Sequence, residues 1–383
     1  MKSSTKSAAF ALVLGAAVVA LGLIIGFPMR SFSEDSDMLK HPLVAAARKE
    51  PMMTMGPSGQ DPALSAPLAS VLTAQKWLNT EPLRPENLRG KVVLVNFWTF
   101  TCVNWLRTFP YVRAWAKKYG DKGLVVIGVH TPEFPFEGDI DNVRKQAKAL
   151  GVDYPIAVDT NYGVWRAFDN NYWPALYLAD AQGRIRAHHF GEGAYEMSEM
   201  ILQQLLADAG FSGFRDDLVT VEPEGTEVAS EWTTLESGET YTGVQQAEGF
   251  ASPGGAVANK PRTYTVPSRL NLNDWALSGL WTITGRAAVL NEANGRIAFR
   301  FHARDVNLVM GPPKGAASVR FRVLIDGESV GAAHGTDVDS QGQGTADDQR
   351  LYQLIRQQGS IEDRTFEIEF LDPSIEAYCF TFG

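Results

Sequence analysis

The sequence predicts an α/β domain followed by an all-β domain of the sandwich or jelly-roll type. A chain of 383 residues is long enough for two domains, since domains usually span about 100–200 residues. Two near-continuous apolar runs, residues 91–98 and 124–129, are typical of buried parallel strands. From about residue 247 onward, apolar and polar residues alternate with a period of two, which is typical of half-buried antiparallel strands.

The first domain is expected over residues 69–210. Between its two apolar runs, apolar residues recur at helical spacing from Leu106 to Tyr119, and Gly120 ends the helix. Further along the chain we expect a helix over 139–150, strands over 175–179 and 185–189, and a closing helix over 197–209. This βαβ…ββα order predicts one sheet with helices on both faces.

The second domain is expected over residues 246–383, after an acidic linker over 211–245. Its clearest strands are predicted over 296–302, 318–325, 364–370 and 375–382, among eight to ten short strands in all. Asn294-Gly295 and Asp326-Gly327 are the turn signals between them.

The N-terminus carries a membrane signal. Lys2 and Lys6 precede an apolar core of 20 residues, Ala8 to Phe27, and about 20 residues suffice for a spanning helix. Cleaved signals usually have a shorter core of about 7–15 residues, so a signal anchor over 1–33 is favoured, although Ser31-Phe-Ser33 leaves cleavage open. The lysine bias places the N-terminus in the cytoplasm. We therefore expect an inner-membrane anchor, a linker over 34–68, and domains that face the periplasm or extracytoplasmic side.

Charge and cysteine content exclude several classes of protein. Acidic residues outnumber basic ones by 44 to 35, which argues against a nucleic-acid partner. Two cysteines, Cys102 and Cys379, exclude a disulfide-dense scaffold and a cysteine-rich metal or iron–sulfur site. His188 and His189 lie near Glu192, but no third ligand has a helpful spacing, so neither a metal nor a cofactor is expected.

Cys102 is the candidate nucleophile. The predicted strand ends at Trp98 and the helix opens near Cys102. Unpaired N–H groups and the positive dipole end at a helix N-terminus favour thiolate over thiol. We therefore predict a lowered pKa and partial exposure for Cys102; an inert buried cysteine is the alternative.

The segments KVVLVNFWTFTCVNWLRTFPYVRAW and DNNYWPALYLADAQGRIRAHHFGEG resemble the thioredoxin fold of TlpA-like redoxins, and especially the thioredoxin-like domain of DipZ-type proteins. Residues 245–383 resemble the β-sandwich tail of the same proteins, which is similar to galactose-binding-like carbohydrate-binding modules. The resemblance implies protein thiols and disulfides as partners, and a glycan as candidate ligand of the tail. It also implies a cis bond at Trp173-Pro174 and substrate contacts at Trp98, Trp105, Trp173 and Pro174. In the tail, Trp275, Trp281 and Tyr352 are candidates either for stacking on a sugar or for the core.

One departure from the family pattern bears on mechanism. The family motif Cys-x-x-Cys reads Cys102-Val-Asn-Trp105 here, so the resolving cysteine is absent. Cys379 is the other thiol, but alternation counted from Ile375 favours a core position for it. Glu133 is a candidate proton acceptor, or else a solvated loop acid.

The sequence thus predicts a membrane-tethered extracytoplasmic thiol–disulfide oxidoreductase with a single active-site cysteine. The alternative is a redox-inactive thioredoxin-fold protein that binds a protein or a carbohydrate. A one-Cys peroxidase is less favoured, because Thr99-Phe-Thr-Cys102 matches the peroxiredoxin pattern but Val95 stands where a proline is expected.

Overall fold

The first domain is built around β2 (Val92–Trp98), which is buried along its whole length. The computed structural model describes residues 64–383 and gives a six-stranded sheet in the order β1-β4-β3-β2-β5-β6. β2 pairs in parallel with β3 (Leu124–His130) and antiparallel with β5 (Ala175–Ala179). The sheet is completed by β1 (Lys76–Leu78), β4 (Ile156–Val158) and β6 (Ile185–Phe190).

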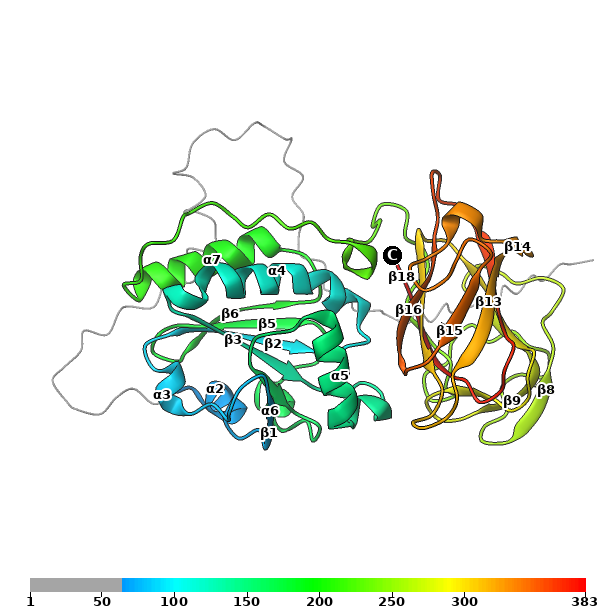
Figure 1. The fold of residues 1–383 in the computed structure, drawn as a ribbon, viewed down its shortest axis with the longest axis horizontal. Helices are drawn as coiled ribbons and strands as arrows, with labels where there is room; N and C mark the ends of the chain where they lie inside the picture. The colour runs from blue at the N-terminus through cyan, green and yellow to red at the C-terminus, as the bar shows by residue number, and fades with distance from the viewer. Residues whose placement is uncertain (1–63) are drawn as a thin grey trace, which may run out of the picture.

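Helices cover both faces of this sheet (Figure 1). Leu94 belongs to the apolar cluster under α4 (Val103–Tyr119) and α7 (Tyr195–Asp208), whereas Val93 and Val95 belong to the cluster under α2 (Ala66–Val71) and α6 (Gly163–Ala167). Successive strand residues point to opposite faces, so a fully apolar strand needs cover on both. The remaining helical segments are α3 (Pro85–Leu88), η2 (Gly120–Lys122), η3 (Pro135–Gly138) and α5 (Ile140–Leu150).

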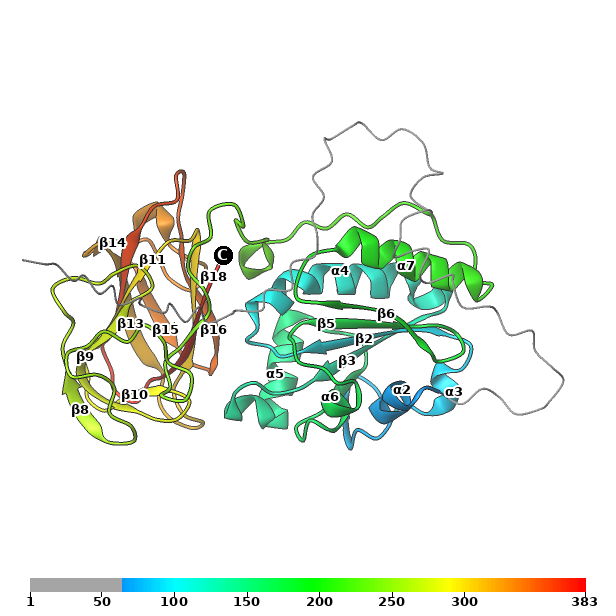
Figure 2. The same cartoon turned by 180° about the vertical axis from the view of Figure 1, so that it is seen from behind.

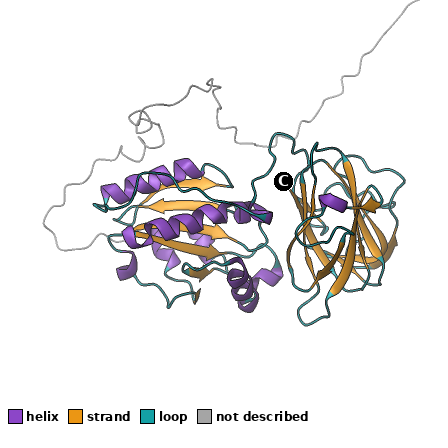
Figure 3. Ribbon diagram, turned by 45° about the horizontal axis from the view of Figure 1, so that its top comes forward, coloured by secondary structure: helices purple, strands orange, loops and turns teal. Residues whose placement is uncertain are grey.

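The second domain is a curled all-β body whose strands enclose their own apolar core (Figure 3). Its strands, in chain order, are β7 (Thr240–Tyr241), β8 (Pro261–Tyr264), β9 (Trp275–Ile283), β10 (Ala288–Leu290), β11 (Gly295–Phe301), β12 (Asp305–Gly311), β13 (Val319–Ile325), β14 (Glu328–Ser329), β15 (Gln343–Ala346), β16 (Arg350–Arg356), β17 (Arg364–Phe370) and β18 (Glu376–Phe382). Of the short helical turns, η4 (Gly225–Glu227) lies between the two domains, where Glu227 pairs with Arg113 of α4, and η5 (Gly331–Ala333) lies between β14 and β15. The predicted fold class, a thioredoxin-like α/β domain followed by an all-β sandwich, is therefore confirmed.

The structure settles one open alternative in the second domain and changes one expectation. Trp275, Trp281 and Tyr352 are all fully buried, so of the two alternatives they are core residues and cannot stack on a sugar. β7 lies within the stretch expected to be linker and pairs with β18, because Thr240 and Tyr241 extend the sheet of the second domain.

The predicted anchor over 1–33 and nearly all of the linker over 34–68 lie outside the described residues. Within 64–383, none of the helices has the length and apolar character needed to cross a bilayer. The two bodies stand side by side, and the C-terminus lies at their junction (Figures 1 and 2).

Candidate active site

Cys102 is the N-cap of α4 and is half-buried. Its Sγ donates a hydrogen bond to the carbonyl of Trp173 over 3.6 Å. The Trp173-Pro174 bond is cis, as the resemblance to TlpA-like redoxins implies. The fold therefore brings the helix start and the cis-proline loop, 71 residues apart in sequence, to the same thiol.

The predicted lowering of the Cys102 pKa is wrong for this arrangement. Burial, together with the charge of Glu133, raises the pKa of the Cys102 thiol well above its usual value. The backbone N–H groups of Trp105 and Asn104 act in the opposite direction, as expected at a helix start, but they are outweighed. Glu239 of the second domain adds to the rise, so part of the effect comes from domain packing.

Trp98 and Trp105 are core residues rather than substrate contacts. Both side chains are fully buried, and their rings stack with centroids 4.3 Å apart. Gly128 on β3 makes room for the Trp98 ring, since a Cβ there would lie 2.8 Å from Trp98 Nε1. Their expected role in substrate binding is therefore not supported, whereas Trp173 is partly exposed and lines a cavity.

Trp105 stands at the position of the missing cysteine and forms a buried hydrogen bond there. Its Nε1 donates to Asn96 Oδ1 over 2.9 Å, and both groups are buried. Asn96 and Trp105 therefore form a neutral hydrogen-bonded pair beneath α4. His130 is equally buried, and burial lowers its pKa to about 3, which keeps the imidazole neutral.

An acid that the sequence reading missed holds the loop beside the thiol. The buried carboxylate of Glu137 accepts hydrogen bonds from Thr101 Oγ1 over 2.5 Å and from the backbone N–H groups of Glu133 and Phe134 over 2.7 and 2.9 Å. Burial raises the pKa of Glu137. Its place in η3 carries no sequence signal, because its partners are two backbone N–H groups and a hydroxyl 36 residues away.

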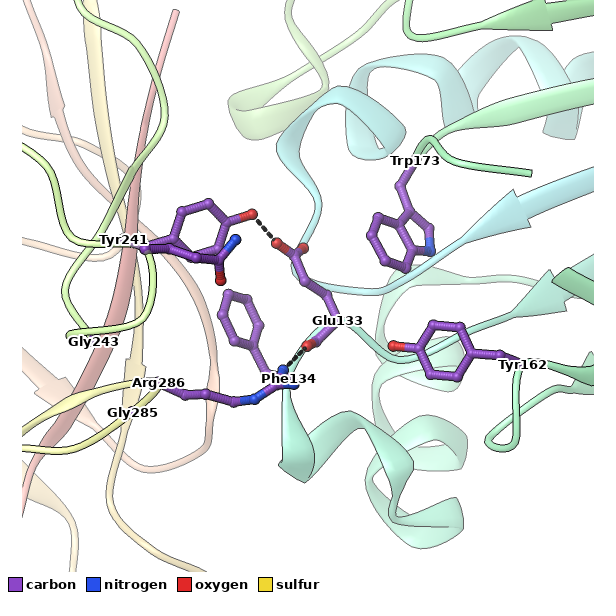
Figure 4. A pocket seen from close by; sticks show the side chains of 9 residues that line it. Glu133, Phe134, Tyr162, Trp173, Tyr241, Gly243, Gly285 and Arg286 are labelled. Atoms are coloured by element: carbon purple, nitrogen blue, oxygen red, sulfur yellow. Dashed lines mark hydrogen bonds between the residues drawn. The ribbon is translucent and has the colours of Figure 1, made fainter. Parts of the chain in front are cut away.

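Glu133 lies at the junction of the two domains (Figure 4). Its carboxylate accepts a hydrogen bond from Tyr241 Oη, and its carbonyl accepts one from Arg286 Nη1 over 3.0 Å. Burial and the nearby Glu239 and Glu137 raise the pKa of Glu133 to about 8. It is therefore not the solvated loop acid of the alternative interpretation.

Together with Trp173, these groups line a cavity of about 240 Å³ between the domains, which Figure 4 shows from close by. Tyr241 and Arg286 come from the second domain, 108 and 153 residues after Glu133. Sequence reasoning missed both, because no local pattern connects them to the nucleophile.

Apolar contacts and a hydrogen bond from a buried arginine join the two domains at this junction. Tyr378 packs on Phe134 and Phe136, with ring centroids 5.3 and 4.9 Å apart. Arg107 of α4 donates to the carbonyl of Phe382 over 3.3 Å and pairs with the carboxylate of Glu192 over 3.2 Å. The second domain therefore packs against the end of the α/β domain that carries Cys102.

Cys379 does not lie where alternation from Ile375 predicts. Ile375 belongs to the inner core of the β domain, whereas Cys379 belongs to the cluster of the α/β domain, against which Cys102 also packs. Among residues 64–383, no group of three His, Cys, Asp or Glu side chains is arranged to hold a metal ion.

Comparisons with known proteins agree with this architecture. The Redoxin family model matches residues 66–203, and that of the thioredoxin-like C-terminal domain matches 237–383. Protein DipZ of Mycobacterium tuberculosis is 40% identical over 239 residues, which cover 61% of this chain and 34% of DipZ. This chain thus spans about a third of the length of that relative.

A shorter relative is matched almost completely. The thiol-disulfide oxidoreductase YkuV of Bacillus subtilis is 30% identical over 145 residues, which cover 38% of this chain and 97% of YkuV. A thioredoxin-like protein solved in its oxidised form is 32% identical, covering 35% of this chain and 90% of its own, with a TM-score of 0.33.

Proposed function

The chain belongs to the redoxin family of thioredoxin-like proteins, and we propose that it carries out thiol–disulfide exchange on protein substrates through the single nucleophile Cys102. The observation that carries the proposal is the position of Cys102 at the start of α4, with Sγ 3.6 Å from the Trp173 carbonyl beside cis Pro174. The kinship with YkuV, a thiol-disulfide oxidoreductase, supports the same chemistry.

In the proposed reaction, the Cys102 thiolate attacks a substrate disulfide and forms a mixed disulfide. Glu133, with its pKa near 8, exchanges a proton with thiols at the site close to neutral pH. Trp105 cannot release the substrate, because its indole carries no thiol and is packed in the core. A thiol from elsewhere must therefore resolve the mixed disulfide.

We further propose that residues 1–33 anchor the chain in the inner membrane with both domains on the extracytoplasmic side. The support is the 20-residue apolar core from Ala8 to Phe27, preceded by Lys2 and Lys6. Deleting residues 1–33 should move the protein from the membrane fraction to the soluble fraction. Recovery of the shortened chain in the membrane pellet would contradict the anchor.

The second candidate function is binding without redox chemistry. The raised pKa of Cys102 favours it, because a thiol held protonated attacks disulfides slowly. A glycan is the proposed ligand of the β domain. The support is a groove of about 790 Å³ between residues 266–272 and polar side chains that include Arg296, Arg300 and Glu367.

Trapping decides between the two functions. The full-length chain is incubated with a disulfide-bonded peptide, quenched with acid, and analysed by mass spectrometry, with Cys102→Ser as the matched control. The exchange proposal expects a peptide adduct on Cys102 in the wild type and none in the variant. Equal, background labelling in the two proteins would favour the binding function instead.

A further inference from the structure

We propose that Cys379 of the β domain acts as the resolving thiol for Cys102, in place of the cysteine that the Cys-x-x-Cys position lacks. This inference rests on the proposed exchange function and adds the residue that completes it. Its basis is the position of Cys379 on the face of the β domain that packs against the domain of Cys102.

A β-bulge turns Cys379 toward the α/β domain. On β12, Leu308 and Met310 point into the β-domain core while Val309 points out of it. On β18, Phe380 pairs with Leu308 and Cys379 with Val309, but the next residue paired, opposite Met310, is Ala377. Tyr378 is thus the extra residue of a bulge, and Tyr378 and Cys379 both face outward.

This outward face packs on the nucleophile's domain. Its apolar side chains are Ala287, Val309, Leu351, Tyr378 and Cys379, and all belong to the same buried cluster as α4 and the loop after β3. Cys102 is packed against that cluster. Burial, Glu239 and Glu133 raise the pKa of Cys379, and the charge of a Cys102 thiolate adds a smaller rise.

Residues on both sides of Cys379 contact the loop after β3, next to Cys102. Its strand neighbour Tyr378 packs on Phe134 and Phe136. Its cross-strand partner Tyr241 hydrogen-bonds Glu133. The residues beside Cys379 thus contact the loop that carries Glu133, and the charge of Glu133 acts on the Cys102 thiol.

The proposed reaction consists of two successive thiol–disulfide exchanges. Cys102 thiolate attacks the substrate disulfide, a Cys102–substrate S–S bond forms, and one substrate sulfur leaves as thiolate. Cys379 thiolate then attacks Cys102 Sγ, the Cys102–Cys379 bond forms, and the second substrate sulfur leaves. The protons of the two cysteines end on the two substrate sulfurs. The substrate gains two electrons, and a dithiol protein restores both cysteines by becoming a disulfide.

The test uses the full-length chain with oxidised glutathione as the small disulfide. Samples are acid-quenched at intervals, and peptides are mapped without reduction. In the wild type, the glutathione adduct on Cys102 should be short-lived and a Cys102–Cys379 linked peptide should accumulate. In Cys379→Ser, the adduct should persist about tenfold longer. Val309→Ala, which loosens the same face but keeps both thiols, should still form the linked peptide.

The outcomes separate the two proposals. Equal adduct lifetimes in the wild type and Cys379→Ser would overturn the resolving role and leave Cys102 as a nucleophile. No adduct in either protein would overturn the exchange function, and the resolving role with it. Because Cys379→Ser could fail to fold, a bimane cross-linker applied to the unmutated chain gives a second measurement. It should bridge Cys102 and Cys379, and absence of the bridge counts against the inference.

Discussion

At the residue scale, Cys102 is subject to two opposed influences. The start of α4 supplies backbone N–H groups that favour its thiolate, while burial and two glutamates favour its thiol. Burial is the larger influence, because removing a thiolate from water costs more than two partial N–H charges return. The nucleophile is therefore held protonated while the two domains are packed together.

This balance predicts how Cys102 titrates. The midpoint of iodoacetamide alkylation against pH should lie above the free-thiol value of about 8.5. Glu133→Gln should lower the midpoint, since Glu133 is ionised above pH of about 8 and its charge opposes the thiolate. Glu222→Gln, which changes an exposed acid in the segment between the two domains, serves as the control. An unchanged midpoint in Glu133→Gln would contradict the electrostatic account.

A second prediction concerns Trp105. Trp105→Cys restores the family motif but empties a site where a buried indole stacks on Trp98 and bonds Asn96. We expect a loss of about 3–5 kcal/mol in the free energy of unfolding, as in other large-to-small aromatic changes. Trp105→Phe keeps most of the volume and should lose less.

Trp105→Cys also tests whether the rest of the active site can still support dithiol chemistry. If Trp105→Cys folds, as a thermal melt would establish first, it should form a 102–105 disulfide and reduce insulin. A folded variant with neither the bond nor turnover would mean that the site has diverged beyond its second cysteine.

At the element scale, the loop that follows β3 is fixed by one buried carboxylate. Glu137 ties Thr101, which precedes Cys102, to the N–H groups of Glu133 and Phe134. The α4 start and the domain-contact loop are therefore held by a common acceptor.

Glu137→Ala should accordingly destabilise the protein more than Glu137→Gln. Each buried donor left without a partner costs about 1–3 kcal/mol, and the amide of glutamine keeps one acceptor oxygen. Urea unfolding of the full chain measures the difference. Equal losses in the two variants would show that packing, rather than hydrogen bonding, accounts for the role of Glu137.

At the scale of the whole molecule, the β domain packs against the end of the α/β domain that carries Cys102. Loosening the contact should therefore expose the thiol. The double variant Tyr241→Phe with Arg286→Ala removes both hydrogen bonds to Glu133 and should raise the rate of Cys102 alkylation. Arg320→Ala, which breaks a salt bridge with Asp372 inside the β domain, is the matched control. Identical rates in all three proteins would mean that the contact does not protect Cys102.

Glu133 also gives the molecule a pH-dependent stability. Its pKa is about 8 in the fold, against 4.5 as the ordinary value. Between these values the folded chain binds more protons than the unfolded chain, so stability falls as pH rises through this window. The exposed Asp372, whose pKa Arg320 lowers to about 2, acts at lower pH in the opposite direction. Thermal melts should therefore show a smaller decline from pH 5 to pH 8 in Glu133→Gln than in the wild type.

The sequence by itself determined the elements that local pattern encodes. Apolar runs identified β2 and β3, helical spacing identified α4, and alternation identified β11, β13, β17 and β18, because each pattern follows from the repeat of a single element. The resemblance around Cys102 and Trp173-Pro174 added the redoxin family and the cis bond.

Only the tertiary structure decided how deeply the Cys102 thiol is buried and which residues surround it. Burial of Cys102, the Tyr241–Glu133 contact and the cluster that holds Cys379 depend on residues more than 100 positions apart. The bulge at Tyr378 reversed the face that alternation assigned to Cys379. One extra residue shifts a period of two by half a cycle, and its presence depends on pairing with β12, which no reading of the β18 segment alone contains.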